Sequence, residues 1–136
     1  MREGCFANLP DSASTRELLK VLTARCVSPG MTELIGGSAG RPPDADLPPT
    51  SIELFFDLAD GVRCVRFLAV GDASMSSVEL VLLDANRGLL ERGESFGRFA
   101  MLPVESTVCL DPGRYSAAAR TATGQGELAL YGFVTE

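Results

Sequence analysis

The residues of this sequence that could do chemistry are its carboxylates, because the chain contains no histidine. Histidine is the usual general base near neutral pH and the commonest ligand of transition metals. Its absence excludes a Ser-His-Asp or Cys-His catalytic arrangement within this chain. Catalysis would have to use carboxylates, Lys20, the tyrosines or a cofactor. The sequence therefore favours a protein that is not an enzyme.

Two pairs of acidic residues come close enough in the sequence to be considered as catalytic pairs. Asp57 and Asp60 flank the first predicted hairpin, and Glu91 and Glu94 lie in the segment ERGES. Glycoside hydrolysis uses two carboxylates, but sequence neighbours on an exposed turn seldom have the required separation. We interpret these four as solvated strand ends. A hydrolase would need two carboxylates to converge in a cleft.

Calcium is the one cofactor for which the sequence offers ligands. Asp72, Asp84 and Asp111 are predicted loop residues, and Ca²⁺ prefers carboxylate and carbonyl oxygens. No D-x-D-x-D-G loop occurs, however, and Asp beside Gly or Pro usually forms a turn. We therefore expect no cofactor, and we keep these three aspartates as the candidate ligands of a calcium site.

The segment GGSAG at 36–40 matches the G-x-S-x-G pattern of a nucleophile elbow. That motif needs a strand before it, a helix after it and a histidine base elsewhere. Here the sequence RPP follows, and no histidine exists. We interpret the match as a coincidence within a glycine-rich loop.

The four cysteines have no C-x2-C spacing, which disfavours a zinc site. They permit three disulfide connectivities, and sequence alone does not choose among them. The pairing Cys5–Cys26 with Cys64–Cys109 is favoured because the first pair brackets a short helical region and the second lies in two strands. Closing a loop of about 45 residues would stabilise the fold by roughly 4 kcal/mol. The alternative is four buried free thiols in a cytosolic protein.

Length and composition indicate one folded domain of 136 residues, with 46% hydrophobic and 22% charged residues. The formal net charge of −6, with no run of its cations, argues against nucleic acid or an anionic membrane as partner. No apolar stretch reaches the length of a membrane span. The first residues lack the apolar region of a signal peptide. We expect either a cytosolic protein or a chain that begins after a removed leader or an upstream domain.

The first 35 residues predict a helical cap. Ser14 and Glu17 have the spacing of a capping box. Apolar residues recur at helical spacing after them, and SPG at 28–30 ends the pattern. We expect the apolar face to pack on the rest of the protein; docking of a partner is the alternative.

The remaining chain predicts a loop followed by an all-β domain. Segment 36–50 is rich in Gly, Pro, Ser and Asp, and we interpret it as a linker or long surface loop. Segment 51–136 contains seven or eight short strands at spacings near ten residues, joined by turn signals. This pattern predicts an antiparallel β-sandwich of jelly-roll or Greek-key type. The nearly all-apolar SVELVLLD at 77–84 predicts a strand buried on both faces.

Four segments of the predicted sandwich resemble a known family. GVRCVRFLAVGD, VELVLLDANRGLL, VCLDPGRYSAAA and GQGELALYGFV are similar to the bacterial pre-peptidase C-terminal domain. They are most similar to its cysteine-containing form, which is repeated in secreted proteins of myxobacteria. The matching positions, within 51–134, are Val78, Leu80, Leu82 or Leu83, Asp84, Gly88, Gly113 and Tyr115.

The resemblance implies a non-catalytic module of an exported bacterial protein, secreted or periplasmic, with a disulfide between Cys64 and Cys109. Our leading hypothesis is a binding or structural module that acts through protein–protein contacts, with a partner protein or a second copy of the chain. Tyr131 and Phe133 share a face of the last strand with Ala129. If that face is exposed, it is the partner surface.

A carbohydrate-binding module, with a polysaccharide as ligand, is the alternative. Five aromatic residues would supply the sugar-stacking platform: Phe55, Phe67, Tyr115, Tyr131 and Phe133. The chain contains no tryptophan, which is the strongest stacking residue. Phe and Tyr at alternating strand positions are also typical of a core.

Overall fold

The structure, a computed structural model, describes residues 5–6, 8–9, 13–27, 29–43, 48–104 and 107–135. Within these ranges the chain forms one helix, α1 (Thr15–Cys26), and ten strands. The strands are β1 (Met31–Arg41), β2 (Thr50–Leu58), β3 (Arg63–Gly71), β4 (Glu79–Asp84), β5 (Leu89–Arg92), β6 (Glu94–Ser95), β7 (Phe99–Leu102), β8 (Val108–Leu110), β9 (Gly113–Thr121) and β10 (Gly126–Thr135).

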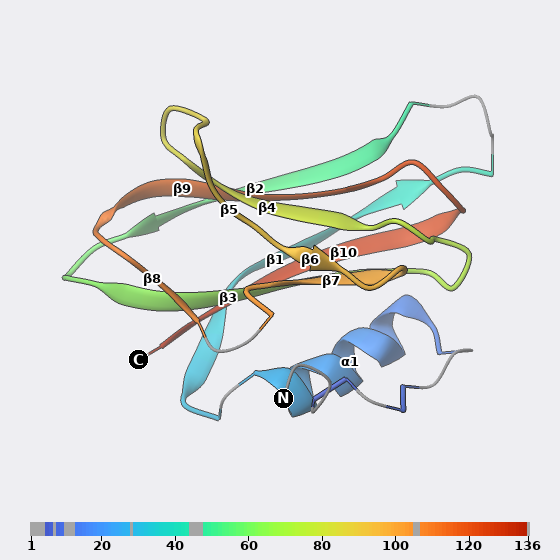
Figure 1. Cartoon of the computed structure of the whole chain (residues 1–136), viewed down its shortest axis with the longest axis horizontal. Helices are drawn as coiled ribbons and strands as arrows, with labels where there is room; N and C mark the ends of the chain where they lie inside the picture. Colours follow the sequence, from blue (N-terminus) through green and yellow to red (C-terminus); the bar gives the residue numbers. More distant parts are fainter. Residues whose placement is uncertain are drawn as a thin grey trace.

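The strands form two antiparallel sheets that pack face to face, with α1 beneath one of them (Figure 1). Sheet A has the order β1-β10-β3-β7-β6, and β8 pairs with β3 off this path. Sheet B has the order β2-β9-β4-β5. The first four strands alternate between the sheets, so their connections cross from layer to layer. The predicted all-β sandwich with one N-terminal helix is confirmed, and every strand expected after residue 51 is present.

The prediction of a linker or loop over 36–50 is wrong for 36–41, which belong to β1 and pair with β10. A Cβ at Gly36 would lie 2.3 Å from the Tyr131 ring, and one at Gly37 would lie 3.3 Å from the Ile52 side chain. Glycine inside a strand often marks such a close approach. The glycines here serve packing, so the β-sandwich begins at Met31. Residues 44–47 lie outside the described part of the chain.

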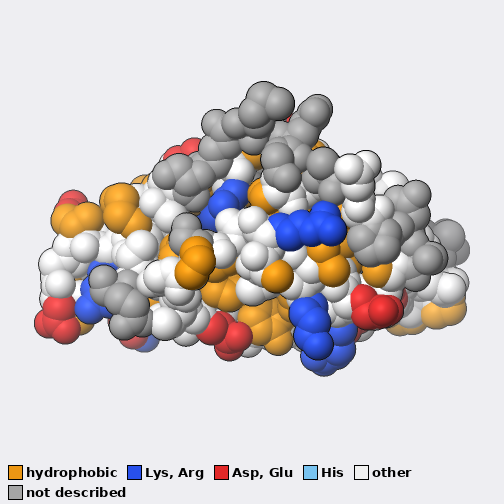
Figure 2. Space-filling view, turned by 90° about the horizontal axis from the view of Figure 1, so that it is seen from below, with side chains coloured by type: hydrophobic (Ala, Val, Ile, Leu, Met, Phe, Trp, Pro, Cys, Tyr) orange, Lys and Arg blue, Asp and Glu red, His pale blue; other side chains and the backbone are white. Residues whose placement is uncertain are grey.

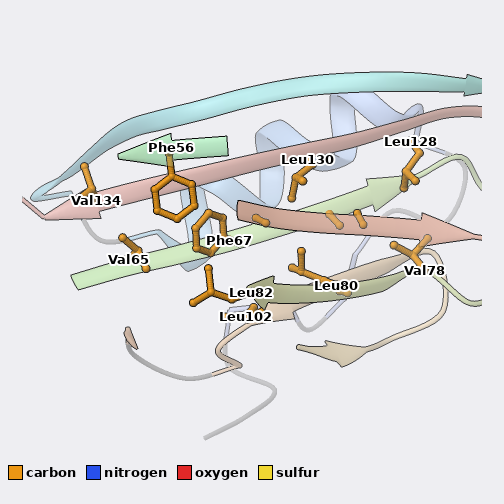
Figure 3. Packing of buried hydrophobic residues seen from close by; sticks show 14 of the residues in the cluster. Phe56, Val65, Phe67, Val78, Leu80, Leu82, Leu102, Leu128, Leu130 and Val134 are labelled. Atoms are coloured by element: carbon orange, nitrogen blue, oxygen red, sulfur yellow. The ribbon is translucent and has the colours of Figure 1, made fainter. Parts of the chain in front are cut away.

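The main core lies between the sheets. Phe67 of β3 is fully buried and contacts Phe56 of β2, with ring centroids 5.5 Å apart. Leu80 and Leu82 of β4 face Leu130 of β10 across the same layer (Figure 3). These residues come from both sheets, so the alternation of apolar side chains along each strand builds one shared interior.

A second core lies between sheet A and α1. The Ser14–Glu17 capping box begins the helix, as predicted. Leu18 and Leu22 are at most 1% exposed and pack against side chains of β3, β7 and β10. The centre of sheet A is thus covered on both faces, and β3 is buried continuously from Val65 onward. The helix uses its apolar face to pack on the sandwich.

The prediction that the strand within 77–84 is buried on both faces is wrong. Leu80 and Leu82 point into the core, whereas Val81 and Leu83 point outward and are only half-buried. The strand buried on both faces is β3, because α1 lies on sheet A and not on sheet B. The apolar outward positions of β4 therefore belong to the surface.

Candidate functional site

The sheet face predicted to bind a partner is not open. Phe133 is 6% exposed, and Ala129 is 3% exposed. Tyr131 is half-buried, and both aromatic residues pack in the cluster that contains Leu18 and Leu22 of α1. The helix occupies this face, so the surface predicted at Tyr131 and Phe133 is interior. In Figure 2, seen from the α1 side, charges of both signs are interspersed over the described surface.

The outer side of sheet B is the alternative, because α1 makes its contacts with β3 and β10 of sheet A. Phe55 and Leu89 on this side are 56% and 53% exposed. We call this side the open face. Its members are Ser51, Glu53, Phe55 and Asp57 of β2, Arg114, Ser116, Ala118 and Arg120 of β9, Glu79, Val81 and Leu83 of β4, Leu89 and Arg92 of β5, and Arg87 of the β4–β5 turn.

The strand registers place apolar side chains in two neighbouring rows at the centre of the open face, with the small Ser116 between Phe55 and Leu83. Ser116 lies opposite both Phe55 and Leu83, and Leu83 in turn lies opposite Leu89. In the next row, Ala118 lies opposite Val81. Large apolar side chains that share an exposed sheet face typify interaction surfaces.

A hollow of about 370 Å³ opens on this face. Its lining includes the outward-facing Ser51, Glu79, Val81, Arg92, Ala118 and Arg120, together with Leu80 of β4 and Ala119 of β9. The small side chain of Ala118 leaves room over the sheet, and longer charged side chains stand around it. The hollow therefore has an apolar floor and a charged rim.

Three ion pairs border the apolar centre. Arg120 Nε lies 2.7 Å from Glu79 Oε1, and Arg114 Nε lies 3.1 Å from Asp57 Oδ1. The third joins Arg87 Nη1 to Glu53 Oε2 at 2.6 Å. Exposed pairs of this kind contribute little to stability. They orient the arginines at the surface.

Glu53 is the best-held carboxylate of the open face. The hydrogen bond from Arg87 is the largest cause that lowers the pKa of Glu53 below its ordinary value; partial burial opposes it, and the Ser116 hydroxyl, which donates at 2.7 Å, adds to the lowering. In return, the pKa of Arg87 is raised by its hydrogen bond to Glu53. This contact ties the β4–β5 turn to β2 across β9.

The open face is positively charged on an acidic molecule. It carries four arginines, at 87, 92, 114 and 120, and three carboxylates, at 53, 57 and 79. Within the described ranges Arg92 makes no ion pair. This surface was not predicted from the sequence, although two signals for it were present. Arginine recurs in the strands that border VELVLLD, and every second side chain of that segment points away from the core.

The three candidate calcium ligands do not come together. Asp72 lies after β3 and accepts hydrogen bonds from Thr15 Oγ1 and, at 3.0 Å, from Glu127 N. Asp84 Oδ1 accepts from the Asn86 and Gly88 amides and closes the β4–β5 turn. The described part of the chain contains no group of three metal-binding side chains. Asp84 serves the turn that Asp beside Gly usually forms.

Asp111 also belongs to a turn. Its carbonyl oxygen accepts a hydrogen bond of 2.6 Å from the Tyr115 hydroxyl. Tyr115 lies opposite Asp84 in the β4–β9 register, so Asp84 and Asp111 are near the same end of the sandwich. Asp72 follows Gly71, which pairs with Leu128 near the start of β10, at the other end. This separation excludes a joint site for the three.

None of three hollows on the described surface brings two carboxylates together. Glu79 is the one carboxylate of the open-face hollow. Two further hollows lie at one end of the sandwich beside Ser74 and Gln125, and Asp72 is their one carboxylate. Asp57, outside these hollows, pairs with Arg114. The arrangement that a carboxylate hydrolase needs is not assembled there.

The five aromatic candidates do not form a sugar-stacking platform. Phe67 is fully buried and Phe133 nearly so. Tyr115 stacks on Phe56 with centroids 5.8 Å apart, and Tyr131 packs in the α1 cluster. Phe55 alone among the five is largely exposed. The described surface therefore lacks the row of rings that the carbohydrate alternative requires.

Both favoured disulfides are formed. Cys5 pairs with Cys26 at the end of α1, and Cys64 pairs with Cys109. Cys64 and Cys109 lie directly opposite each other in the β3–β8 ladder. Within the described residues no cysteine is free. The first disulfide anchors the N-terminal segment to the helix, and the second joins the short β8 to the centre of sheet A.

Comparisons with known proteins agree with this architecture. No protein-family model matches the sequence, and no curated protein matches it either. Among solved structures, the pre-peptidase C-terminal domain of a collagenase from Bacillus anthracis matches with a TM-score of 0.54 and 13% identity. The match covers 73% of this chain and 88% of that domain. The described chain includes no helix that is long and apolar enough to cross a membrane. The two antiparallel sheets and this structural likeness show that the chain has the fold of a pre-peptidase C-terminal domain.

Proposed function

We propose that this chain is a non-catalytic binding module of an exported protein and that it binds a partner protein through the open face of sheet B. One observation carries the proposal. The outward side chains of β4, Val81 and Leu83, are apolar. Leu83 lies directly opposite the exposed Leu89, and the exposed Phe55 lies in the same row on the far side of Ser116. Sheet A has α1 over its outer side, whereas sheet B presents apolar residues and arginines to solvent.

The composition of the open face supports a protein as the partner. Arginine and aromatic residues are enriched in protein interfaces, and a few central apolar anchors supply most of the binding energy. Phe55 and the arginines at 87, 92, 114 and 120 match this description. The hollow beside them offers a place for a partner side chain. We expect Phe55 and Leu89, the two large apolar residues of the open face that are most exposed, to be the main anchors.

Two observations support the exported and non-catalytic parts of the proposal. Disulfides form and persist in oxidising compartments, and this chain forms two of them. The hollow on the open face contains one carboxylate, and the chain has no histidine. We further infer that the chain corresponds to the cysteine-containing form of the pre-peptidase C-terminal domain, since Cys64 pairs with Cys109.

The test compares proteins retained by three immobilised forms of the full chain. The forms are the wild type, the double variant Phe55→Ser with Leu89→Ser, and the control Val62→Ser. Val62 is 62% exposed in the β2–β3 turn, so the control removes a similar exposed apolar group elsewhere. Each form is incubated with culture medium and envelope extract of the producing cells, and quantitative mass spectrometry measures what is retained.

We expect at least one protein to be retained by the wild type and the Val62 variant and to be depleted about tenfold or more with the double variant, as loss of an interface anchor implies. Thermal unfolding should show that all three forms are folded. Equal retention by the three forms would mean that the open face is not the interface.

A further inference from the structure

We infer that the occupant of the open face is a polypeptide segment that carries a carboxylate next to an apolar side chain, with the carboxylate bound to Arg92 at the hollow. This inference rests on the proposed function and names the chemistry of the partner. It is carried by the charges around the hollow and by the apolar pair on its floor.

The floor of the hollow is suited to an apolar side chain. Val81 and Ala118 lie opposite each other in the β4–β9 ladder and both point outward. The volume of about 370 Å³ falls at the lower end of the range of ligand sites, roughly 300–1,000 Å³. An aliphatic or aromatic side chain from a partner would therefore be removed from water between these two residues and the rim.

The rim is suited to a carboxylate. Arg92 lies opposite Val81 in the β4–β5 ladder, so its side chain stands beside the floor, and it has no ion-pair partner in the described part of the molecule. A guanidinium binds a carboxylate through two parallel hydrogen bonds. A carboxylate that follows the apolar anchor of the partner would meet Arg92 at the hollow.

The same rim disfavours a basic ligand. Glu79 is the one acidic group of the hollow, and Arg120 already pairs with it at 2.7 Å. A lysine or arginine entering the hollow would compete with Arg120 for Glu79 and would face Arg92 as well. Like charges brought together at an interface reduce affinity and so exclude wrong partners.

The charge of the whole molecule favours the same ligand. The open face carries one more arginine than carboxylates, while the chain as a whole carries −6. The rest of the molecule therefore carries −7. An acidic segment is repelled by the remainder of the surface and attracted to this face, so the field orients the encounter.

The test selects binders from a displayed library of random twelve-residue peptides against the full chain. The footprint of each selected peptide is mapped by the shifts of backbone amide NMR signals, including those of Val81, Arg92 and Ala118. Affinities are then measured for the wild type, Arg92→Gln, Arg92→Lys and Lys20→Gln. Lys20→Gln is the matched control, because Lys20 is exposed on α1 and its replacement changes the net charge equally.

We expect the selected peptides to be enriched in Asp or Glu next to an apolar residue and to shift the amides around the hollow. Arg92→Gln should weaken their binding about tenfold, as loss of a charge-assisted hydrogen bond implies. Arg92→Lys should restore part of the affinity, and Lys20→Gln should leave it within about twofold. Binding to the wild type should weaken as the salt concentration rises.

The outcomes separate this inference from the proposed function. Peptides that map to the open face without acidic enrichment, and that bind Arg92→Gln as tightly as the wild type, would overturn the inference and leave the face as the interface. Peptides whose footprint lies elsewhere, or a selection that yields no binder, would count against the proposed function as well. Arg92 is exposed, so unfolding of its variants should match that of the wild type.

Discussion

At the scale of single residues, Glu53 links stability to pH. Its pKa is lowered below the ordinary 4.5, first by Arg87, so the folded chain binds fewer protons at this site than the unfolded chain around pH 4. The stabilisation is fully present above pH 4.5 and is lost as the pH falls through the lower folded pKa. We expect Glu53→Gln to cost about 1 kcal/mol at pH 7, because water screens the exposed Arg87.

Urea unfolding of both forms at pH 7, 5 and 3 checks this prediction. The difference in the free energy of unfolding between wild type and Glu53→Gln should be the same at pH 7 and 5 and smaller at pH 3. A difference that grows as the pH falls would show that the sign is wrong. Asp57→Asn serves as the control, because Asp57 and its partner Arg114 are both about two-thirds exposed.

Arg66 is a buried cation held by carbonyl groups. It is 8% exposed and donates hydrogen bonds to the carbonyls of Cys26, Pro103 and Val104. Burial lowers the pKa of Arg66, which remains a strong base.

We expect Arg66→Met to destabilise the fold by about 2–4 kcal/mol, because it leaves these carbonyls unpaired. Arg66→Lys should recover only part of this loss in stability, because an ammonium group keeps the charge but has fewer N–H donors than a guanidinium. Urea unfolding at pH 7 measures both, and a methionine variant as stable as the wild type would contradict this account.

At the scale of elements, β1 depends on the absence of a side chain at one position. Gly36 and Gly40 both lie in β1, four positions apart. A Cβ at Gly36 would collide with the Tyr131 ring, whereas a Cβ at Gly40 would have no atom within 4 Å. We expect Gly36→Ala to cost about 1–3 kcal/mol through overpacking. Gly40→Ala should be neutral or stabilising by up to about 1 kcal/mol. Thermal unfolding of the two variants measures these changes in stability. Equal changes in the two variants would mean that the Tyr131 ring is not held beside Gly36.

The docking of α1 depends on its buried face. Leu22 is fully buried between the helix and sheet A, and Thr15 at the helix start donates to Asp72 and to the carbonyl of Glu127. We expect Leu22→Ala to cost about 2–5 kcal/mol in the free energy of unfolding. Lys20→Ala, on the exposed side, should change it by less than about 0.5 kcal/mol. Similar losses in the two variants, measured in urea, would argue against the observed docking.

At the scale of the whole molecule, the two disulfides close loops of different length. The cysteines are 21 positions apart in one and 45 in the other. In the chain-entropy model the longer loop contributes about 0.7 kcal/mol more. We expect removal of the longer-loop disulfide, by Cys64→Ser with Cys109→Ser, to lower the free energy of unfolding more than removal of the other, by Cys5→Ser with Cys26→Ser. The difference should be at least this amount. Urea unfolding of the two double variants shows which disulfide contributes more to stability. Mass spectrometry of the alkylated wild type should show four labels after reduction and none without it.

Local patterns were enough to predict most elements of the fold. The Ser14–Glu17 spacing marks the start of α1, because a capping box satisfies backbone donors within one turn. Alternation and turn residues predict the strands after residue 51, because side chains repeat every two residues along a strand. Composition failed for β1, where Gly36 and Gly37 suggested a loop. Their role depends on the Tyr131 ring and the Ile52 side chain, which lie far away in the sequence.

The candidate site illustrates the limit of such patterns. The sequence by itself determined the all-β sandwich, the helix and the sets of residues that share a strand face, since these follow from local periodicity. Only the tertiary structure decided which face is covered. Helix α1 packs on Tyr131 and Phe133 and leaves Val81 and Leu83 outward, reversing both expectations. The helix meets sheet A through contacts between residues more than 100 positions apart, such as Thr15 with Glu127, and strand periodicity carries no information about such contacts.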